Sequence, residues 1–228
     1  MFSLEGRVAL VTGASSGFGE HFARVLAEAG ADVVVAARRK ERLDALADAL
    51  RADGHVVEAV AMDVADDASV AEAFAGAEAA MGGRAVDLLI NNAGIASPNL
   101  FLEIDSSEFD ELMGTNLRGA FFVAQQFCRR LVDRGQPGSI VNISSILGQR
   151  TGSRQSIYGA SKAALDQLTR NLAMELARSG EPPSPPNPHH HHHPPTDRPP
   201  ARRGARRDSL AGPRRHPRQR PGAGLLRH

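Results

Sequence analysis

Residues 8–20 read Val-Ala-Leu-Val-Thr-Gly-Ala-Ser-Ser-Gly-Phe-Gly-Glu, and this stretch decides the fold. Its first five residues are apolar or β-branched, which is typical of a buried strand. The glycines that follow lead into an amphipathic run from Gly17 to Ala29, which predicts a helix. Such a strand, glycine turn and helix presents backbone N–H groups to a pyrophosphate. Taken alone, the same spacing also fits a tight connection between a strand and a helix.

Short apolar runs continue to alternate with longer amphipathic runs as far as Gly180. This alternation predicts four further strands, near residues 32–37, 56–61, 86–91 and 139–143, and four further helices, near residues 40–52, 67–81, 107–134 and 156–178. We therefore expect an α/β fold with a doubly wound, Rossmann-type parallel sheet. At 228 residues and 42% hydrophobic content, the chain suits one domain rather than two.

The composition changes abruptly after Gly180. Residues 181–228 hold twelve of the fourteen Pro, seven of the nine His and ten Arg. They carry a net charge of +7, which leaves −6 on residues 1–180. Proline removes backbone donors, and few apolar side chains are present to build a core. We divide the chain into a domain at 1–180 and a basic tail at 181–228, which we expect to be disordered.

Three motifs follow one another in an order that is typical of one enzyme family. After the glycine loop, residues 91–94 read Asn-Asn-Ala-Gly, and residues 158–162 read Tyr-Gly-Ala-Ser-Lys. Together these motifs resemble the short-chain dehydrogenase/reductase family over residues 5–180. The resemblance implies an oxidoreductase that moves a hydride between a nicotinamide cofactor and a carbonyl or secondary alcohol. The C-terminal part of the family fold is replaced after residue 180 by the Pro/Arg/His-rich tail.

The resemblance also implies where the cofactor lies. Its pyrophosphate meets the glycine loop, its adenine meets the residues after the third strand, and its nicotinamide ribose meets the last helix. The cofactor-binding residues that this implies are Gly13, Ser15, Ser16, Gly17, Phe18, Gly19, Asp63, Val64, Asn92, Ala93, Gly94, Tyr158 and Lys162.

The residues that follow the second predicted strand bear on the choice of cofactor. An acidic side chain there would accept hydrogen bonds from a ribose 2′-OH and repel a 2′-phosphate. The chain has Ala37 at that position, followed by Arg38 and Arg39, whose guanidinium groups suit a phosphate dianion. The pattern favours NADP(H) over NAD(H), although a solvated basic turn would have the same residues.

Tyr158 and Lys162 are four residues apart in a predicted helix, so their side chains lie on one face about a turn apart. An ammonium close to a phenol stabilises the phenolate, and the hydroxyl can then protonate a carbonyl or deprotonate an alcohol. This makes Tyr158, the only tyrosine of the chain, the predicted general acid/base. The resemblance adds Ser145 as the residue that orients the substrate, with Ser144 as the alternative. It also adds Asn116, which holds the lysine through a water.

Further patterns set expectations about partners and location. Cys128 is the only cysteine and lies in an apolar helical run, where a core thiol is expected and no metal site is predicted. The chain has neither a signal-peptide pattern nor a long apolar span, so we expect a cytoplasmic protein. The resemblance implies a small-molecule substrate and a homo-oligomer formed through the helices near residues 107–134 and 156–178.

Two interpretations of the tail remain open. We interpret it as an out-of-frame translation of a GC-rich coding region, since shifted codons there yield Pro, Arg, Ala, Gly and His; the gene sequence would test this. The alternative is a genuine basic segment that binds nucleic acid or an acidic partner, but it has no aromatic side chain for base stacking, which argues against nucleic acid. If turnover requires the family's last strands, the chain is instead a non-catalytic cofactor-binding or interaction protein.

Overall fold

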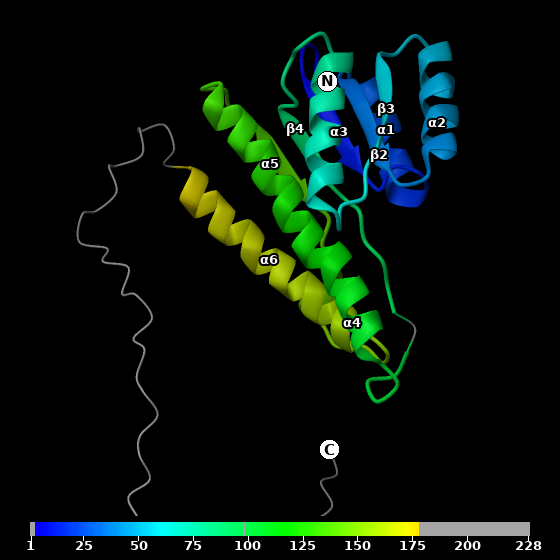
Figure 1. Ribbon diagram of the computed structural model, residues 1–228, viewed down its shortest axis with the longest axis vertical. Coiled ribbons are helices and arrows are strands. Elements are labelled where there is room, and N and C mark those ends of the chain that lie inside the picture. The colour runs from blue at the N-terminus through cyan, green and yellow to red at the C-terminus, as the bar shows by residue number, and fades with distance from the viewer. Residues whose placement is uncertain (1–2, 98, 178–228) are drawn as a thin grey trace, which may run out of the picture. The chain divides into compact units, whose positions relative to one another are not determined.

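The computed structural model describes residues 3–97 and 99–177. Within these residues, five strands form one parallel sheet in the order β3-β2-β1-β4-β5 (Figure 1). The strands are β1 (Val8–Thr12), β2 (Asp32–Ala37), β3 (Val57–Ala61), β4 (Leu88–Asn91) and β5 (Ser139–Asn142). Because β1 lies in the middle and the chain winds outward on both sides of it, the sheet is doubly wound, as the sequence predicts.

Helices cover both faces of the sheet, because neighbouring side chains of each strand point to opposite faces. Leu10 and Val34 pack into a core beneath α3 and α5, while Val11 and Val35 pack into a second core with α1 and α2. All four of these side chains are fully buried. The helices are α1 (Gly17–Glu28), α2 (Lys40–Ala52), α3 (Asp67–Ala80), α4 (Ser106–Met113), α5 (Ala120–Asp133) and α6 (Ser156–Leu176).

The helix predicted over residues 107–134 forms in three parts. A π-helical segment, η1 (Gly114–Gly119), joins α4 directly to α5. A π-helix takes more residues per turn than an α-helix, and such segments often lie at functional sites. The candidate site residue Asn116 lies in η1 and is fully buried. The other strand and helix boundaries agree with the sequence predictions to within two residues.

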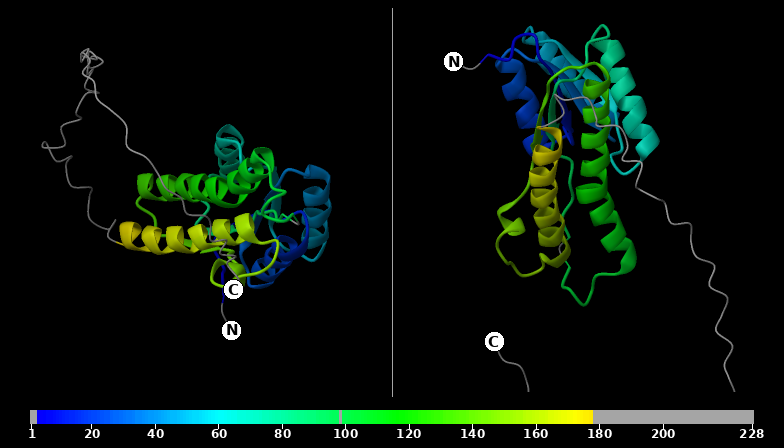
Figure 2. Two further views of the ribbon diagram at one scale, coloured as in Figure 1. Left: turned by 90° about the horizontal axis from the view of Figure 1, so that it is seen from below. Right: turned by 90° about the vertical axis from the view of Figure 1, so that its left-hand side faces the viewer.

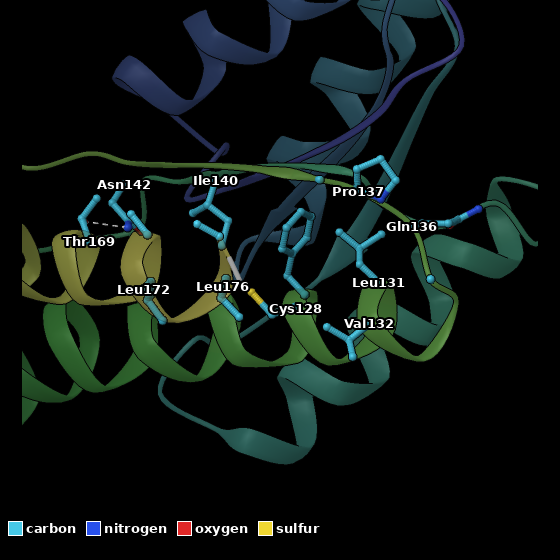
Figure 3. Close-up of a pocket in the computed structure, with 15 residues that line it drawn as sticks. Cys128, Leu131, Val132, Gln136, Pro137, Ile140, Asn142, Thr169, Leu172 and Leu176 are labelled. Atoms are coloured by element: carbon cyan, nitrogen blue, oxygen red, sulfur yellow. Dashed lines mark hydrogen bonds between the residues drawn. The ribbon is translucent and has the colours of Figure 1, made fainter. Parts of the chain in front are cut away.

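Residues of α5, β5 and α6 line a groove at the edge of the sheet. The helices α5 and α6 run side by side (Figure 2). The groove has a volume of about 770 Å³. Its labelled apolar side chains come from all three elements (Figure 3) and include Leu131, Ile140, Leu172 and Leu176. Among the described residues, β5 pairs with β4 alone, so this is an open edge of the sheet.

The predicted tail at 181–228 lies outside the described residues, and the division of the chain at residue 180 therefore stays a prediction. In the part of the chain that the structure describes, no helix is both long and apolar enough to cross a membrane. The same residues contain no group of three or more His, Cys, Asp or Glu side chains suited to hold a metal ion.

Candidate active site

The glycine loop between β1 and α1 packs directly against the segment that follows β4. A Cβ on Gly13, whose φ is +68°, would lie 2.9 Å from the Cα of Ala93. A Cβ on Gly19 would lie 2.4 Å from the carbonyl oxygen of Gly13 and 2.7 Å from the Nδ2 of Asn92. Both positions therefore require glycine, because protein atoms already occupy the space that a Cβ would take.

Thr12, at the end of β1, binds the two segments together. Its hydroxyl oxygen accepts hydrogen bonds from the backbone N–H groups of Asn92 (2.9 Å) and Ala93 (3.0 Å). In return, the Nδ2 of Asn92 donates to the backbone oxygen of Thr12 at 2.9 Å. The glycine loop and the Asn-Asn-Ala-Gly motif thus form one unit at the carboxyl ends of β1 and β4, where doubly wound folds bind ligands.

The N-terminus of α1 is suited to an anion. The N-cap residue, Ser16, has an extended backbone and its side chain makes no capping hydrogen bond. The first backbone N–H groups of the helix therefore keep their donor capacity and carry the positive end of the helix dipole. Phe18 lies at the same place, is 74% exposed, and stacks on Phe22 with a ring-centroid distance of 6.2 Å. A pyrophosphate fits this helix end by charge and by donor supply.

The arginines that follow β2 lie beside this loop. Arg39 donates from Nη2 to the hydroxyl oxygens of Ser15 (2.8 Å) and Ser16 (3.1 Å). Lys40 is paired with Asp44 on α2, whereas no ion pair between described residues involves Arg39. The link between Arg39 and the two serines was not foreseen from the sequence, because it joins segments more than twenty residues apart. It places a guanidinium beside the N-terminus of α1.

The residues predicted to meet the adenine also lie at the carboxyl ends of the strands, just after β3. The carboxylate of Asp63 accepts from the backbone N–H of Ala65 at 3.0 Å, and its own N–H donates to Ser69 at 2.9 Å. Val64 is buried beside Gly119 of η1. This turn therefore has a fixed shape set by its own hydrogen bonds.

Tyr158 and Lys162 lie in the first two turns of α6, as predicted. Lys162 is only 4% exposed, and its Nζ donates to the backbone oxygen of Ile143 at 2.8 Å. The same Nζ lies 5.7 Å from the centroid of the Tyr158 ring. Burial lowers the pKa of Lys162, and the nearby carboxylate of Asp166 partly opposes that effect by raising it. A Cβ on Gly94 would lie 3.6 Å from Nζ, so the site adjoins the Asn-Asn-Ala-Gly motif.

Both polar atoms of the Asn116 side-chain amide make hydrogen bonds within the protein. Its Oδ1 accepts from the backbone N–H of Ile95 at 2.8 Å, and its Nδ2 donates to the backbone oxygen of Ile95 at 2.8 Å. Nδ2 also lies 3.2 Å from the hydroxyl oxygen of Ser161, which donates to the backbone oxygen of Tyr158 at 2.7 Å. Sequence reasoning did not foresee these bonds. They connect η1 to the segment after β4 and to the helix of Tyr158.

The two candidate serines after β5 differ in their hydrogen bonds. Ser145 caps a short 3-10 turn, η2 (Ile146–Gly148), by accepting from the N–H of Leu147 at 3.2 Å. Ser144 instead donates its hydroxyl to the backbone oxygen of Lys162 at 3.3 Å. In these contacts Ser145 acts only as an acceptor, so its hydroxyl proton is free to be donated to a ligand.

Comparison with known proteins then decides the family. A family model described as short chain dehydrogenase matches residues 7–180. The chain belongs to the short-chain dehydrogenase family. Gluconate 5-dehydrogenase of Gluconobacter oxydans is 39% identical over 180 residues, which cover 79% of this chain and 69% of that protein. L-xylulose reductase of Bos taurus is 41% identical over 174 residues, which cover 76% of this chain and 67% of that protein.

Solved structures give the same answer for the fold. A gluconate 5-dehydrogenase from Burkholderia cenocepacia, crystallised with NADP and tartrate, matches with a TM-score of 0.73 and 37% identity over 78% of this chain and 69% of that chain. A putative gluconate dehydrogenase from Agrobacterium tumefaciens matches with a TM-score of 0.74 and 36% identity over 78% and 70% of the two chains. This short-chain dehydrogenase is thus an oxidoreductase by family, with the Rossmann-type fold of its relatives.

Proposed function

We propose that this short-chain dehydrogenase transfers a hydride between NADP(H) and a carbonyl or secondary alcohol, with Tyr158 as the general acid/base. The observation that carries the proposal is the position of Lys162. Its buried Nζ lies 5.7 Å from the centroid of the Tyr158 ring and donates to the backbone oxygen of Ile143, just after β5. It also lies beside Gly94, which follows the residues bonded to Thr12. The candidate proton donor and cation on α6, and a helix N-terminus suited to an anion, thus adjoin the same Asn-Asn-Ala-Gly segment, which supports the proposal.

The described residues fit a dinucleotide cofactor. The start of α1 offers backbone donors, a Cβ on Gly17 would meet nothing within 4 Å, and the guanidinium of Arg39 lies beside this loop. When bound, the nicotinamide of such a cofactor accepts or supplies the hydride. Arg38 and Arg39 would hold a 2′-phosphate, which is the basis for proposing NADP(H) rather than NAD(H).

The proton is handled by the chain's own residues. Tyr158 would give its hydroxyl proton to a carbonyl oxygen in reduction, or take the proton of an alcohol in oxidation. The ammonium of Lys162 would stabilise the phenolate that this leaves. Ser145 would donate a hydrogen bond to the substrate oxygen and so fix its place relative to Tyr158. Asn116 would hold Lys162 through a water and fix the backbone around Ile95 and Ser161.

The substitution Tyr158→Phe tests the assignment of the general acid/base. We expect turnover to fall by roughly 10²- to 10⁴-fold, the usual contribution of a positioned acid/base group, while affinity for the cofactor is retained. Turnover would be followed by absorbance of the reduced cofactor, with gluconate and L-xylulose as first substrates because relatives are named for them. Undiminished turnover in the variant would exclude Tyr158 from this role.

The substitution Arg39→Ala tests the cofactor preference. We expect NADPH to bind roughly tenfold to a hundredfold more weakly, because a charge-assisted hydrogen bond is lost, and NADH to bind as before. Titrations that follow cofactor fluorescence and thermal stability measure both affinities, since a ligand of the native state raises its stability. Arg42→Ala, which removes an exposed arginine on α2, is the matched control. Equal loss of NADPH and NADH affinity would contradict a phosphate contact.

A second candidate function is favoured by the open edge at β5. A chain that binds cofactor without turnover would be a cofactor-binding or interaction protein, and cofactor binding with no turnover of any carbonyl would support it.

We also propose a homo-oligomer, because Phe109 on α4 and Phe121 on α5 are 45% and 40% exposed. Light scattering would measure the mass of the protein in solution, and a mass of two or more chains would support the homo-oligomer. We also propose the division of the chain into a domain at residues 1–180 and an out-of-frame tail at residues 181–228.

A further inference from the structure

Glu108 lies in the first turn of α4, and its side chain makes an unexpected contact. Asp105, the N-cap residue, accepts a hydrogen bond from the N–H of Glu108 at 2.9 Å. In a capping box, a glutamate at this third helical position would reach back to the N–H of the N-cap residue. Instead, the carboxylate of Glu108 accepts from the hydroxyl of Ser97 and from the Nδ2 of Asn99, the latter at 2.8 Å.

These bonds fix the segment that leaves β4. Ser97 is 5% exposed, and its hydroxyl oxygen also accepts from the backbone N–H of Asn99 at 3.2 Å. The segment therefore folds around the carboxylate of Glu108. Two residues earlier, both backbone groups of Ile95 are bound by Asn116. The backbone that starts beside Lys162 at Gly94 is thus held at two points, one on η1 and one on α4.

The contact of Glu108 with Ser97 and Asn99 bears on the active site because of where the segment after β4 lies. Ligands of doubly wound folds bind outside the carboxyl ends of the strands, and this segment leaves the carboxyl end of β4. Gly94 approaches Lys162, while Gly94 and Ala96 are both exposed. A substrate that binds beside Tyr158 and Lys162 would therefore lie next to Gly94, from which the segment held by Glu108 continues. Small misplacements of such a wall weaken the alignment of a bound substrate.

We propose that Glu108 is a positioning residue, which holds residues 95–97 and 99 in place and thereby shapes the substrate side of the active site. This inference rests on the proposed function, since it assumes that a substrate binds next to Tyr158 and Lys162. Glu108 does not touch the reacting atoms. It acts through Ser97 and Asn99 on the path by which the substrate approaches.

Three variants test this role. Glu108→Ala removes both hydrogen bonds, Glu108→Gln keeps an acceptor for Ser97, and Glu111→Ala removes an exposed glutamate one turn along α4 as the control. We expect Glu108→Ala to raise the KM for substrate about tenfold, with kcat and NADPH affinity within about twofold of the starting protein. Its amide hydrogen exchange should become faster in residues 93–97 and 99 and stay unchanged in the sheet. Glu108→Gln should recover part of the KM, and Glu111→Ala should resemble the starting protein.

The outcomes separate this inference from the proposed function. A lower melting temperature in Glu108→Ala with an unchanged KM would show a purely structural role and overturn the inference, while the oxidoreductase assignment would stand. If the starting protein binds NADPH but turns over no carbonyl, the proposed function fails. In that case amide exchange alone tests the role of Glu108 in fixing the segment. Faster exchange in Glu108→Ala that is confined to residues 93–97 and 99 supports this role. Unchanged or uniformly faster exchange overturns it.

Discussion

Lys162 is the residue whose charge state the fold affects most directly. Its side chain is almost fully buried, and burial lowers its pKa because the charged form loses hydration. Asp166, one turn further along α6, raises the pKa again, but burial has the larger effect. Asp166 therefore keeps Lys162 protonated to a higher pH than burial alone would allow. This matters because only the protonated amine can stabilise a phenolate at Tyr158.

The substitution Asp166→Asn removes that opposing charge, and we expect the pKa of Lys162 to fall further. The ammonium would then be lost at a lower pH, so the alkaline limb of the kcat/KM profile should shift toward lower pH, with a smaller effect on its acid limb. The measurement is a pH–rate profile of both proteins. Glu175→Gln, at an exposed position near the end of the same helix, should leave the profile in place. A profile that does not move in Asp166→Asn would show that Asp166 has no influence on Lys162.

Single residues also show the limit of sequence reasoning about the site. The strand ends and the helix spacing were sufficient to predict that Tyr158 and Lys162 share one helix face. They were not sufficient to predict the bonds from Arg39 to Ser15 or from Glu108 to Ser97, because these depend on how separate segments pack. Residue type indicates which side chains can form such bonds, but only the packed fold decides which partners they meet.

At the scale of elements, buried strands and amphipathic helices could be predicted because their patterns repeat along the chain. The π-helical segment η1 could not, because its extra residue reflects tertiary contacts and no local pattern of the sequence. Gly119, at its end, packs against the turn after β3: a Cβ there would lie 2.8 Å from the backbone oxygen of Val64. Close approach of α5 to this turn requires glycine and holds η1 in place.

Two glycine substitutions in η1 test that contact. Gly119→Ala should lower the free energy of unfolding by about 1–3 kcal/mol, because a backbone oxygen must move to admit the methyl group. Gly114→Ala, where a Cβ would meet nothing within 4 Å, should be neutral or raise the free energy of unfolding by up to about 1 kcal/mol through helix propensity. Urea denaturation measures both values. Equal stability of the two variants would show that η1 is not held by its contact with Val64.

At the scale of the whole molecule, the described domain is covered unevenly. Among the described residues β3 and β5 are both edge strands, and β5 is the one that borders the apolar groove between α5 and α6 (Figure 3). Residues 135–149, which include β5, contain no charged side chain. Natural sheets usually protect an open edge with charges, prolines or bulges, since unpaired backbone groups can pair with another chain. This edge has none of these within β5, so the described part of the chain is open to association there.

The substitution Val141→Lys places a charge on that edge and tests whether it drives association. Val141 lies in the middle of β5 and is 45% exposed, so the lysine can reach water without disturbing the core. Val25→Lys is the matched control, because Val25 is 46% exposed on α1 and lies away from the edge while the added charge is the same. Light scattering over a concentration series should show fewer species of high mass for Val141→Lys alone. If both variants reduce them equally, net charge limits association and the edge of β5 does not cause it.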